Sequence, residues 1–401
     1  MANVLDLAFA MDCTGSMGSY ITEARNNIEA IVTEVVESEK CQVRLALVEY
    51  RDHPPQDKTF ITRKHDFTDS ADTMKLWLRE CEADGGGDTP EAVADALNDV
   101  LNLSWREEAT KMCVFVTDAP PHGLATEDCS DSFPDGCPEG LDPMEIAKQL
   151  AGKGVSLYVV GCEPSVSPYK DFYLAVAHVT GGQYVPLADA KGLVKIIIYG
   201  SREEMSLKKL EAEVEEEIKV LTSSGIVINE EELSSSLHKR WKSRGEKSKQ
   251  LMLNQRGLET AKNSADAMAM TKMGFDDVRS LFSTSSREAK KASGTLHDSK
   301  AKESAGEGPS KDMDMDAKTA MVTAALADIK TASKSSSGDW VKIDFSGLAE
   351  TIDFGPAEEK KQSIDEVSGY QCIDGGVTLS QTMRVVQKSM MKMSNSGKTD
   401  K

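Results

Sequence analysis

Alternating strand-like and helix-like segments in residues 1–200 constrain the fold more than any other feature of this chain. Apolar runs typical of buried strands recur between segments whose apolar residues are spaced three and four apart. Strands are expected at 4–11, 42–50, 60–63, 111–117, 155–161 and 183–186, and helices at 21–31, 71–82, 92–101, 143–151, 169–179 and from about 190. This order predicts a doubly wound α/β fold, with a mostly parallel sheet flanked by helices on both faces.

The first apolar run ends in three oxygen-bearing side chains at a spacing of two residues: Asp12, Thr14 and Ser16. In open α/β sheets, ligands bind outside the carboxyl ends of the strands. One carboxylate and two hydroxyls can supply half of the near-octahedral oxygen shell that Mg²⁺ requires. Ser and Thr are also frequent helix N-caps, so this segment alone leaves metal binding and capping open.

Two further segments bring oxygen atoms to predicted loops. Asp88 and Thr89 follow the glycines 85–87 and precede a predicted helix, and the strand 111–117 ends on Asp118. The glycines permit close approach of the backbone, although a capped helix after a flexible turn explains the same residues. A nucleotide-binding phosphate loop is excluded, because no Lys follows the glycines.

At these residues the sequence resembles the von Willebrand factor A domain, a Rossmann-like fold that carries a metal-ion-dependent adhesion site. The five positions of that site are filled by Asp12, Thr14, Ser16, Thr89 and Asp118. The resemblance implies that the three hydroxyls bind Mg²⁺ or Mn²⁺ directly and that the two aspartates bind it directly or through water. It further implies an open coordination position that a Glu or Asp carboxylate of a partner protein completes. The function implied is therefore divalent-metal-dependent protein binding rather than catalysis.

Segments 50–55, 85–93, 118–123, 133–138 and 181–187 are also similar to the A domain of the von Willebrand A-type alpha-kinases, which are intracellular proteins. This likeness raises an alternative, in which the chain is a non-catalytic relative or regulatory part of an alpha-kinase system in serine/threonine kinase signalling. No Gly-rich loop followed by a strand Lys, and no Cys/His cluster, occurs after residue 200. We therefore expect no kinase domain and no enzymatic activity, although His53 and His122 lie on loops where a general base could act.

The net charge of −19 argues against nucleic acid and anionic membrane surfaces as partners. No apolar run is long enough to predict a membrane span, and no leader segment is evident at the N-terminus. The expected location is the cytoplasm, with reduced cysteines and with Cys13, Cys113 and Cys162 as buried thiols. A zinc site built from Cys129, Cys137 and His122 is an alternative, but the spacing is not that of a zinc knuckle.

Three regions are expected: an A domain over 1–200, a helical hairpin over 201–250, and a largely disordered tail with short helices over 251–401. The tail is rich in Ser, Lys, Ala, Asp and Glu and poor in core-forming residues. Within it, 317–329 has helical spacing, and 338–345 is an aromatic segment suited to binding a partner or the folded domain. A scaffold in which this tail does the binding is therefore a further hypothesis.

Overall fold

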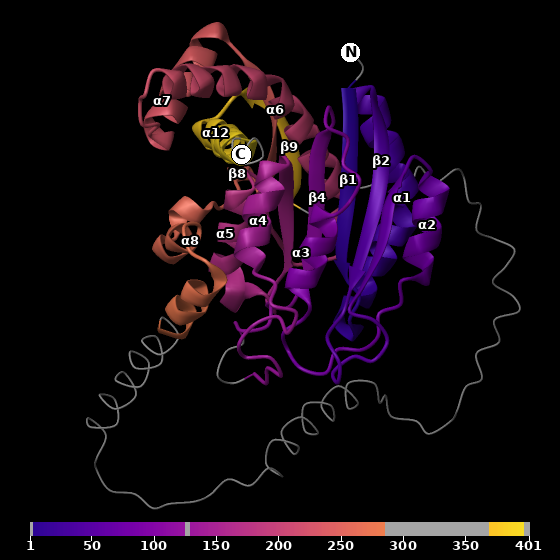
Figure 1. Cartoon of the computed structure of the whole chain (residues 1–401). Helices are drawn as coiled ribbons and strands as arrows, with labels where there is room; N and C mark the ends of the chain where they lie inside the picture. The colour runs from indigo at the N-terminus through magenta and orange to yellow at the C-terminus, as the bar shows by residue number, and fades with distance from the viewer. Residues whose placement is uncertain (1–2, 125–128, 285–368, 397–401) are drawn as a thin grey trace, which may run out of the picture. The chain divides into compact units, whose positions relative to one another are not determined.

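The computed structural model describes residues 3–124, 129–284 and 369–396 of the 401-residue chain (Figure 1). The strands are β1 (Asn3–Asp12), β2 (Cys41–Tyr50), β3 (Thr62–Thr68), β4 (Thr110–Thr117), β5 (Val155–Cys162), β6 (Gln183–Leu187), β7 (Lys247–Leu253), β8 (Arg256–Gly257) and β9 (Tyr370–Gly376). The α-helices are α1 (Gly18–Glu39), α2 (Ala71–Glu80), α3 (Val93–Leu101), α4 (Pro143–Gly152), α5 (Lys170–Val179), α6 (Gly192–Ser223), α7 (Glu230–Arg244), α8 (Ala265–Met270) and α12 (Leu379–Ser396). The segments 317–329 and 338–345 lie outside the described residues.

A six-stranded sheet in the order β3-β2-β1-β4-β5-β6 forms the centre of the fold, and only its edge strand β3 is antiparallel to its neighbour. This confirms the predicted doubly wound α/β fold. The register pairs Asp12 with Tyr50 and Met11 with Val116, so β1, β2 and β4 end at nearly the same level. The loops that follow these strands therefore meet at one edge of the sheet.

Helices cover both faces of the sheet. Because successive residues of each strand point to opposite sides, the side chains on both faces are buried. Ala8, Ala10 and Phe115 belong to the core beneath α3, α4 and α5, whereas Phe9 and Val114 belong to the core beneath α1, α2 and α6. The near-continuous apolar runs of the sequence follow from this double coverage.

The described C-terminal segment differs from the tail expected after residue 250. β9 pairs with β7 in a second, three-stranded sheet, and α12 contacts α6 and α7 (Figure 1). Val385 and Val386 of α12 lie in one apolar cluster with Val214 of α6 and Trp241 of α7. The hairpin of α6 and α7 therefore has an apolar face that is covered by a segment far along the chain, which local sequence spacing does not reveal.

Charged side chains also join α12 to α6 and to the loop before β6. Arg384 forms buried ion pairs with Glu203, at 2.9 Å, and with Glu204. Lys388 pairs with Glu211 at 2.8 Å. The guanidinium of Arg384 also donates to the backbone carbonyl of Gly181 at 2.9 Å. These contacts place cationic groups beside carboxylates that are buried on α6.

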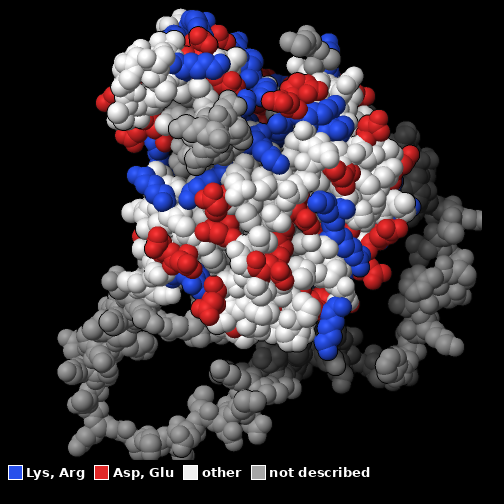
Figure 2. Space-filling model, in the orientation of Figure 1, with Lys and Arg blue, Asp and Glu red and all other residues white. Residues whose placement is uncertain are grey.

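Acidic and basic side chains are interspersed over the face drawn in Figure 2. None of the helices in the described ranges is long and apolar enough to cross a bilayer.

Candidate metal centre

Asp12, the last residue of β1, is fully buried at the sheet edge where the loops meet. Its Oδ1 accepts hydrogen bonds from the backbone N–H of Thr14 at 2.9 Å and from the Thr14 hydroxyl at 2.6 Å. The hydroxyls of Thr14 and Ser16 are 3.5 Å apart. The second carboxylate oxygen of Asp12, Oδ2, is buried and has no hydrogen-bond partner. A buried oxygen without a donor is costly, and a cation at this point would compensate it.

Helix capping does not explain the oxygen atoms of these loops. Thr14 precedes a short 3₁₀ helix, but its side chain makes no capping hydrogen bond, and α1 begins only at Gly18. Helix α3 follows Ala92 rather than Asp88 or Thr89. The Asp88 carboxylate instead accepts from the backbone N–H of Ser132 at 2.7 Å. The capping interpretation of both segments is therefore wrong.

The glycine loop 85–87 lies directly against the Asp12 loop. The backbone N–H of Gly15 donates to the carbonyl of Gly85 at 3.4 Å. Gly86 adopts φ +81°, and a Cβ at this position would lie 3.1 Å from Glu91 Oε1 and 3.4 Å from Thr14 Cβ. Glycine is required here because both the backbone conformation and the narrow space between Thr14 and Glu91 exclude a side chain.

Acidic groups are concentrated around Asp12. Burial and, to a smaller extent, the charge of Asp118 raise the pKa of Asp12 to about 7. Burial, followed by the charges of Asp12 and Asp52, raises the pKa of Glu91 to about 11. These carboxyl groups therefore resist ionising together, and a divalent cation would remove much of their repulsion. The oxygen-only donor set around Asp12 fits a hard cation such as Mg²⁺ or Mn²⁺.

The structure places the five predicted ligands unequally. Asp12, Thr14 and Ser16 are brought together in one loop, and Asp118 lies within electrostatic range of Asp12. Thr89 makes a backbone hydrogen bond to the carbonyl of Ser130 at 3.5 Å, and no described contact joins it to the other four residues. Its role as a ligand stays a prediction.

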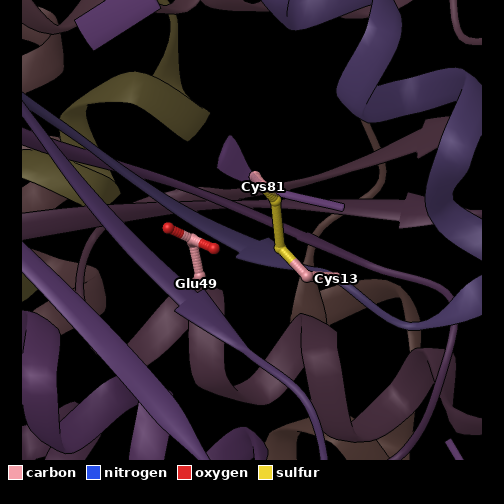
Figure 3. Close-up of side chains that lie close together, drawn as sticks. All are labelled: Cys13, Glu49 and Cys81. Carbon is pink, nitrogen blue, oxygen red and sulfur yellow. A yellow bond between two sulfur atoms is a disulfide. The ribbon is translucent and has the colours of Figure 1, made fainter. Parts of the chain in front are cut away.

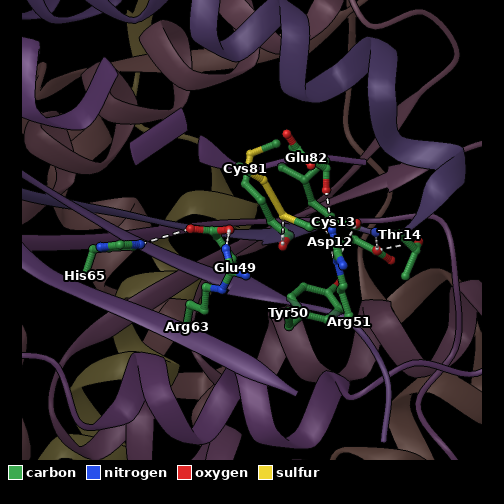
Figure 4. The surroundings of a disulfide bond; sticks show 12 residues. Asp12, Cys13, Thr14, Glu49, Tyr50, Arg51, Arg63, His65, Cys81 and Glu82 are labelled. Carbon is green, nitrogen blue, oxygen red and sulfur yellow. Dashed lines mark hydrogen bonds and ion pairs between the residues drawn. A yellow bond between two sulfur atoms is a disulfide. The ribbon is translucent and has the colours of Figure 1, made fainter. Parts of the chain in front are cut away.

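A disulfide joins Cys13 to Cys81, beside the candidate metal loop (Figures 3 and 4). This contradicts the expectation that Cys13 is a buried thiol and that all cysteines are reduced. The bond forms because the residue after α2 lies against the end of β1. Glu49 is close to both sulfur atoms, and its carboxylate interacts with His65 at 2.9 Å. Disulfide sulfurs are not thiolates, so these three residues do not offer a soft metal site in this state.

His122 forms a second charged group at the same sheet edge. Its Nε2 lies 2.7 Å from Asp52 Oδ1, and its Nδ1 lies 2.9 Å from Asp131 Oδ1. Burial alone would lower the pKa of His122, but Asp131 and Asp52 outweigh burial and raise it to about 9. His122 is therefore an imidazolium held by two carboxylates. Asp52 was not among the predicted site residues, although it follows the end of β2 closely, as Asp118 follows β4.

Residues 6–128 match the family model described as the von Willebrand factor A domain. An alpha-protein kinase of Dictyostelium discoideum, vwkA, is 26% identical over 155 residues, which cover 38% of this chain and 24% of that protein. A putative ariadne-like RING finger protein of Acanthamoeba polyphaga mimivirus is 27% identical over 190 residues, covering 45% of this chain and 18% of that protein. The aligned region therefore spans less than a quarter of the length of either relative.

Among solved structures, a von Willebrand factor type A protein from Catenulispora acidiphila is 16% identical, with a TM-score of 0.35 over 51% of this chain and 43% of that one. The family match covers β1 to β4, including Asp12, Thr89 and Asp118. From this match, and from the strand order described above, residues 6–128 are assigned to a von Willebrand factor A domain.

Proposed function

We propose that this chain is a protein-binding module whose A domain captures its partner through a bound Mg²⁺ or Mn²⁺ ion. The observation that carries the proposal is the buried Oδ2 of Asp12, which has no hydrogen-bond partner and lies close to the charge of Asp118. Von Willebrand factor A domains are typically protein-interaction modules, which agrees with this use of the site.

Asp12, Thr14, Ser16 and Asp118 would hold the cation, with Thr89 as the fifth proposed ligand. When bound, the ion supplies an electrophilic position that a carboxylate of another protein can fill. Thr14 orients Asp12 through two hydrogen bonds, so Oδ2 is directed by the fold rather than by the ion. The hydroxyl ligands carry no charge, and this leaves positive charge on the ion for the partner.

The proposed partner is a protein that presents a Glu or Asp side chain. A charged group bound in a partly dry site is held more strongly than a surface ion pair. Neither nucleic acid nor catalysis forms part of this proposal. Action in the cytoplasm stays a prediction. The Cys13–Cys81 disulfide argues against that location, because disulfides persist mainly in oxidising compartments. Cell fractionation in the presence of a thiol-trapping reagent tests both the location of the protein and the redox state of Cys13 and Cys81.

Calorimetric titration of Mg²⁺ into the full chain is the first test. We expect saturable binding that is lost in Asp12→Ala and retained in the control Asp99→Ala, which changes a half-buried aspartate of α3 paired with Lys64. Equal binding by Asp12→Ala and the wild type would refute the site.

Partner capture should then depend on the ion. In a pull-down, chelation and Asp12→Ala should each abolish capture, whereas Asp99→Ala should not. Capture that survives both treatments would instead support the scaffold hypothesis, in which the tail over 251–401 binds the partner.

The second candidate function is regulation within an alpha-kinase system, favoured by the similarity to the Dictyostelium kinase. Under this alternative the chain itself transfers no phosphate but alters the activity of a kinase that it binds. A phosphorylation assay with and without the chain tests it, and unchanged kinase activity in the presence of a bound chain would exclude it.

A further inference from the structure

We propose that His53, Asp95 and Cys137 form a second metal site, distinct from the Asp12 centre, and that it takes Zn²⁺. The three side chains come from the loop after β2, from α3 and from the loop that precedes α4. One potential ligand atom from each lies within 4.8 Å of the other two. His53 is buried and Cys137 is half-buried.

The distances among the three ligand atoms fit tetrahedral zinc. His53 Nε2 lies 3.0 Å from Asp95 Oδ2, and Cys137 Sγ lies 3.3 Å from the same oxygen and 4.0 Å from His53 Nε2. Zinc bonds of about 2.0–2.3 Å at tetrahedral angles separate N and O ligands by about 3.3 Å and S from either by about 3.6 Å. Shifts of a few tenths of an ångström therefore convert the observed cluster into a coordination shell.

The ligand types select zinc over the hard cation of the Asp12 centre. Thiolate sulfur and imidazole nitrogen prefer Zn²⁺, whereas Mg²⁺ prefers oxygen. A Cys thiolate and an Asp carboxylate together balance the two positive charges of the ion, so the occupied site carries no net charge. Three protein ligands leave a fourth position for water, as is common when zinc has three protein ligands.

The loop that carries Cys137 is already positioned by its neighbours. Phe133 packs edge-on against the His53 ring at 5.6 Å and against the His122 ring at 5.0 Å. The backbone N–H of Gly136 donates to the carbonyl of Phe133 at 2.9 Å. A zinc ion would fasten residues 129–142, which form no helix or strand, to α3 and to the loop after β2.

This set of ligands differs from the one expected from the sequence. The sequence suggested His122, Cys129 and Cys137 as the zinc ligands. In the structure, both ring nitrogens of His122 are engaged by Asp52 and Asp131. Cys129 is not part of the cluster of His53, Asp95 and Cys137. The two variants Cys137→Ser and Cys129→Ser therefore form a matched pair from the same region of the chain.

Cobalt substitution in the full chain tests the proposal, because Co²⁺ bound to a thiolate gives a near-ultraviolet charge-transfer band that oxygen ligands do not give. The titration is done without reductant and under anaerobic conditions, so that the Cys13–Cys81 disulfide stays closed. We expect one equivalent of Co²⁺ to produce the band in the wild type and in Cys129→Ser, and Zn²⁺ to displace it. The band should be absent in Cys137→Ser.

Zinc affinity, measured by competition with a chromophoric chelator, should fall by at least about 100-fold in Cys137→Ser, since loss of even an outer partner of a ligand costs 10- to 100-fold. Circular dichroism checks that each variant is folded. If Cys137→Ser does not fold, Asp95→Asn, which keeps the shape of the side chain, should still weaken cobalt binding about tenfold or more. Absence of the band in the folded wild type, its persistence in Cys137→Ser, or unchanged affinity in Asp95→Asn would overturn the proposal.

Discussion

Replacing Asp12 by Asn should make the metal-free protein more stable at neutral and alkaline pH, although it removes a proposed metal ligand. In the chelated protein, burial and the charge of Asp118 raise the pKa of Asp12 from 3.8 to about 7. At about 1.4 kcal/mol per pKa unit, this difference corresponds to about 4 kcal/mol of unfolding free energy. Because the pKa of Asp12 is raised in the folded state, the loss of unfolding free energy caused by its ionisation is absent below pH 4 and grows as the pH rises to about 7.

The assay is urea unfolding of the wild type and Asp12→Asn at pH 4, 6 and 8 in the presence of chelator. The stability of the variant relative to the wild type should rise by about 4 kcal/mol between pH 4 and pH 8. The control Asp131→Asn should already be less stable than the wild type at pH 4, because its carboxylate accepts the backbone N–H groups of Gly123 and Phe133 and its pKa is lowered despite burial. The stability that this carboxylate contributes is lost only at lower pH.

Adding Mg²⁺ should offset most of the stability advantage of Asp12→Asn. At a concentration 100 times the dissociation constant, binding stabilises the wild type by about 2.7 kcal/mol. Asp12→Asn should gain almost nothing. A relative stability that does not change with pH, or an equal gain from Mg²⁺ in both proteins, would refute the reasoning.

Three other substitutions test the contacts of α12 and the loops around the candidate site. Arg384→Met removes a buried ionic partner of Glu203 and should lower the free energy of unfolding, measured chemically, by about 3–5 kcal/mol. Adding Glu203→Gln should recover part of this loss. Full stability in Arg384→Met would contradict the buried pairing. Cys81→Ser should lower the free energy of unfolding by about 4 kcal/mol relative to the oxidised wild type, because the disulfide closes a loop of 68 residues. Under reducing conditions the two proteins should be equally stable. Gly86→Ala should weaken Mg²⁺ binding, measured calorimetrically, because the new Cβ contacts Thr14; unchanged affinity would show that the loop has room to move.

The sequence predicted the sheet and the Asp12 loop well because both depend on local patterns. Apolar runs define β1 and β4, and parallel strands bring their carboxyl ends to one edge, which places Asp12 near Asp118. Glu91 was not among the predicted ligands. It is buried, and its backbone N–H donates to the carbonyl of Pro120, in the loop after β4.

The contacts that the sequence did not predict join residues distant along the chain. The Cys13–Cys81 disulfide depends on where α2 ends relative to β1, which spacing does not determine. The packing of α12 depends on Arg384 meeting Glu204, at a separation of 180 residues. Short helices were expected in the tail, but no local pattern indicated what α12 packs against.

The position of Arg384 has a consequence for how the protein is made. Ribosomes synthesise the chain from its N-terminus, and domains fold as they emerge. Glu204 is therefore translated 180 residues before the guanidinium that compensates it, and Gly181, whose carbonyl the same guanidinium contacts, is translated 203 residues before it. A ribosome-bound chain that stops before residue 384 presents this carboxylate and the apolar face of α6 to water or to a chaperone. Synthesis of α12 thus completes the cover of a fold whose first strand begins at Asn3.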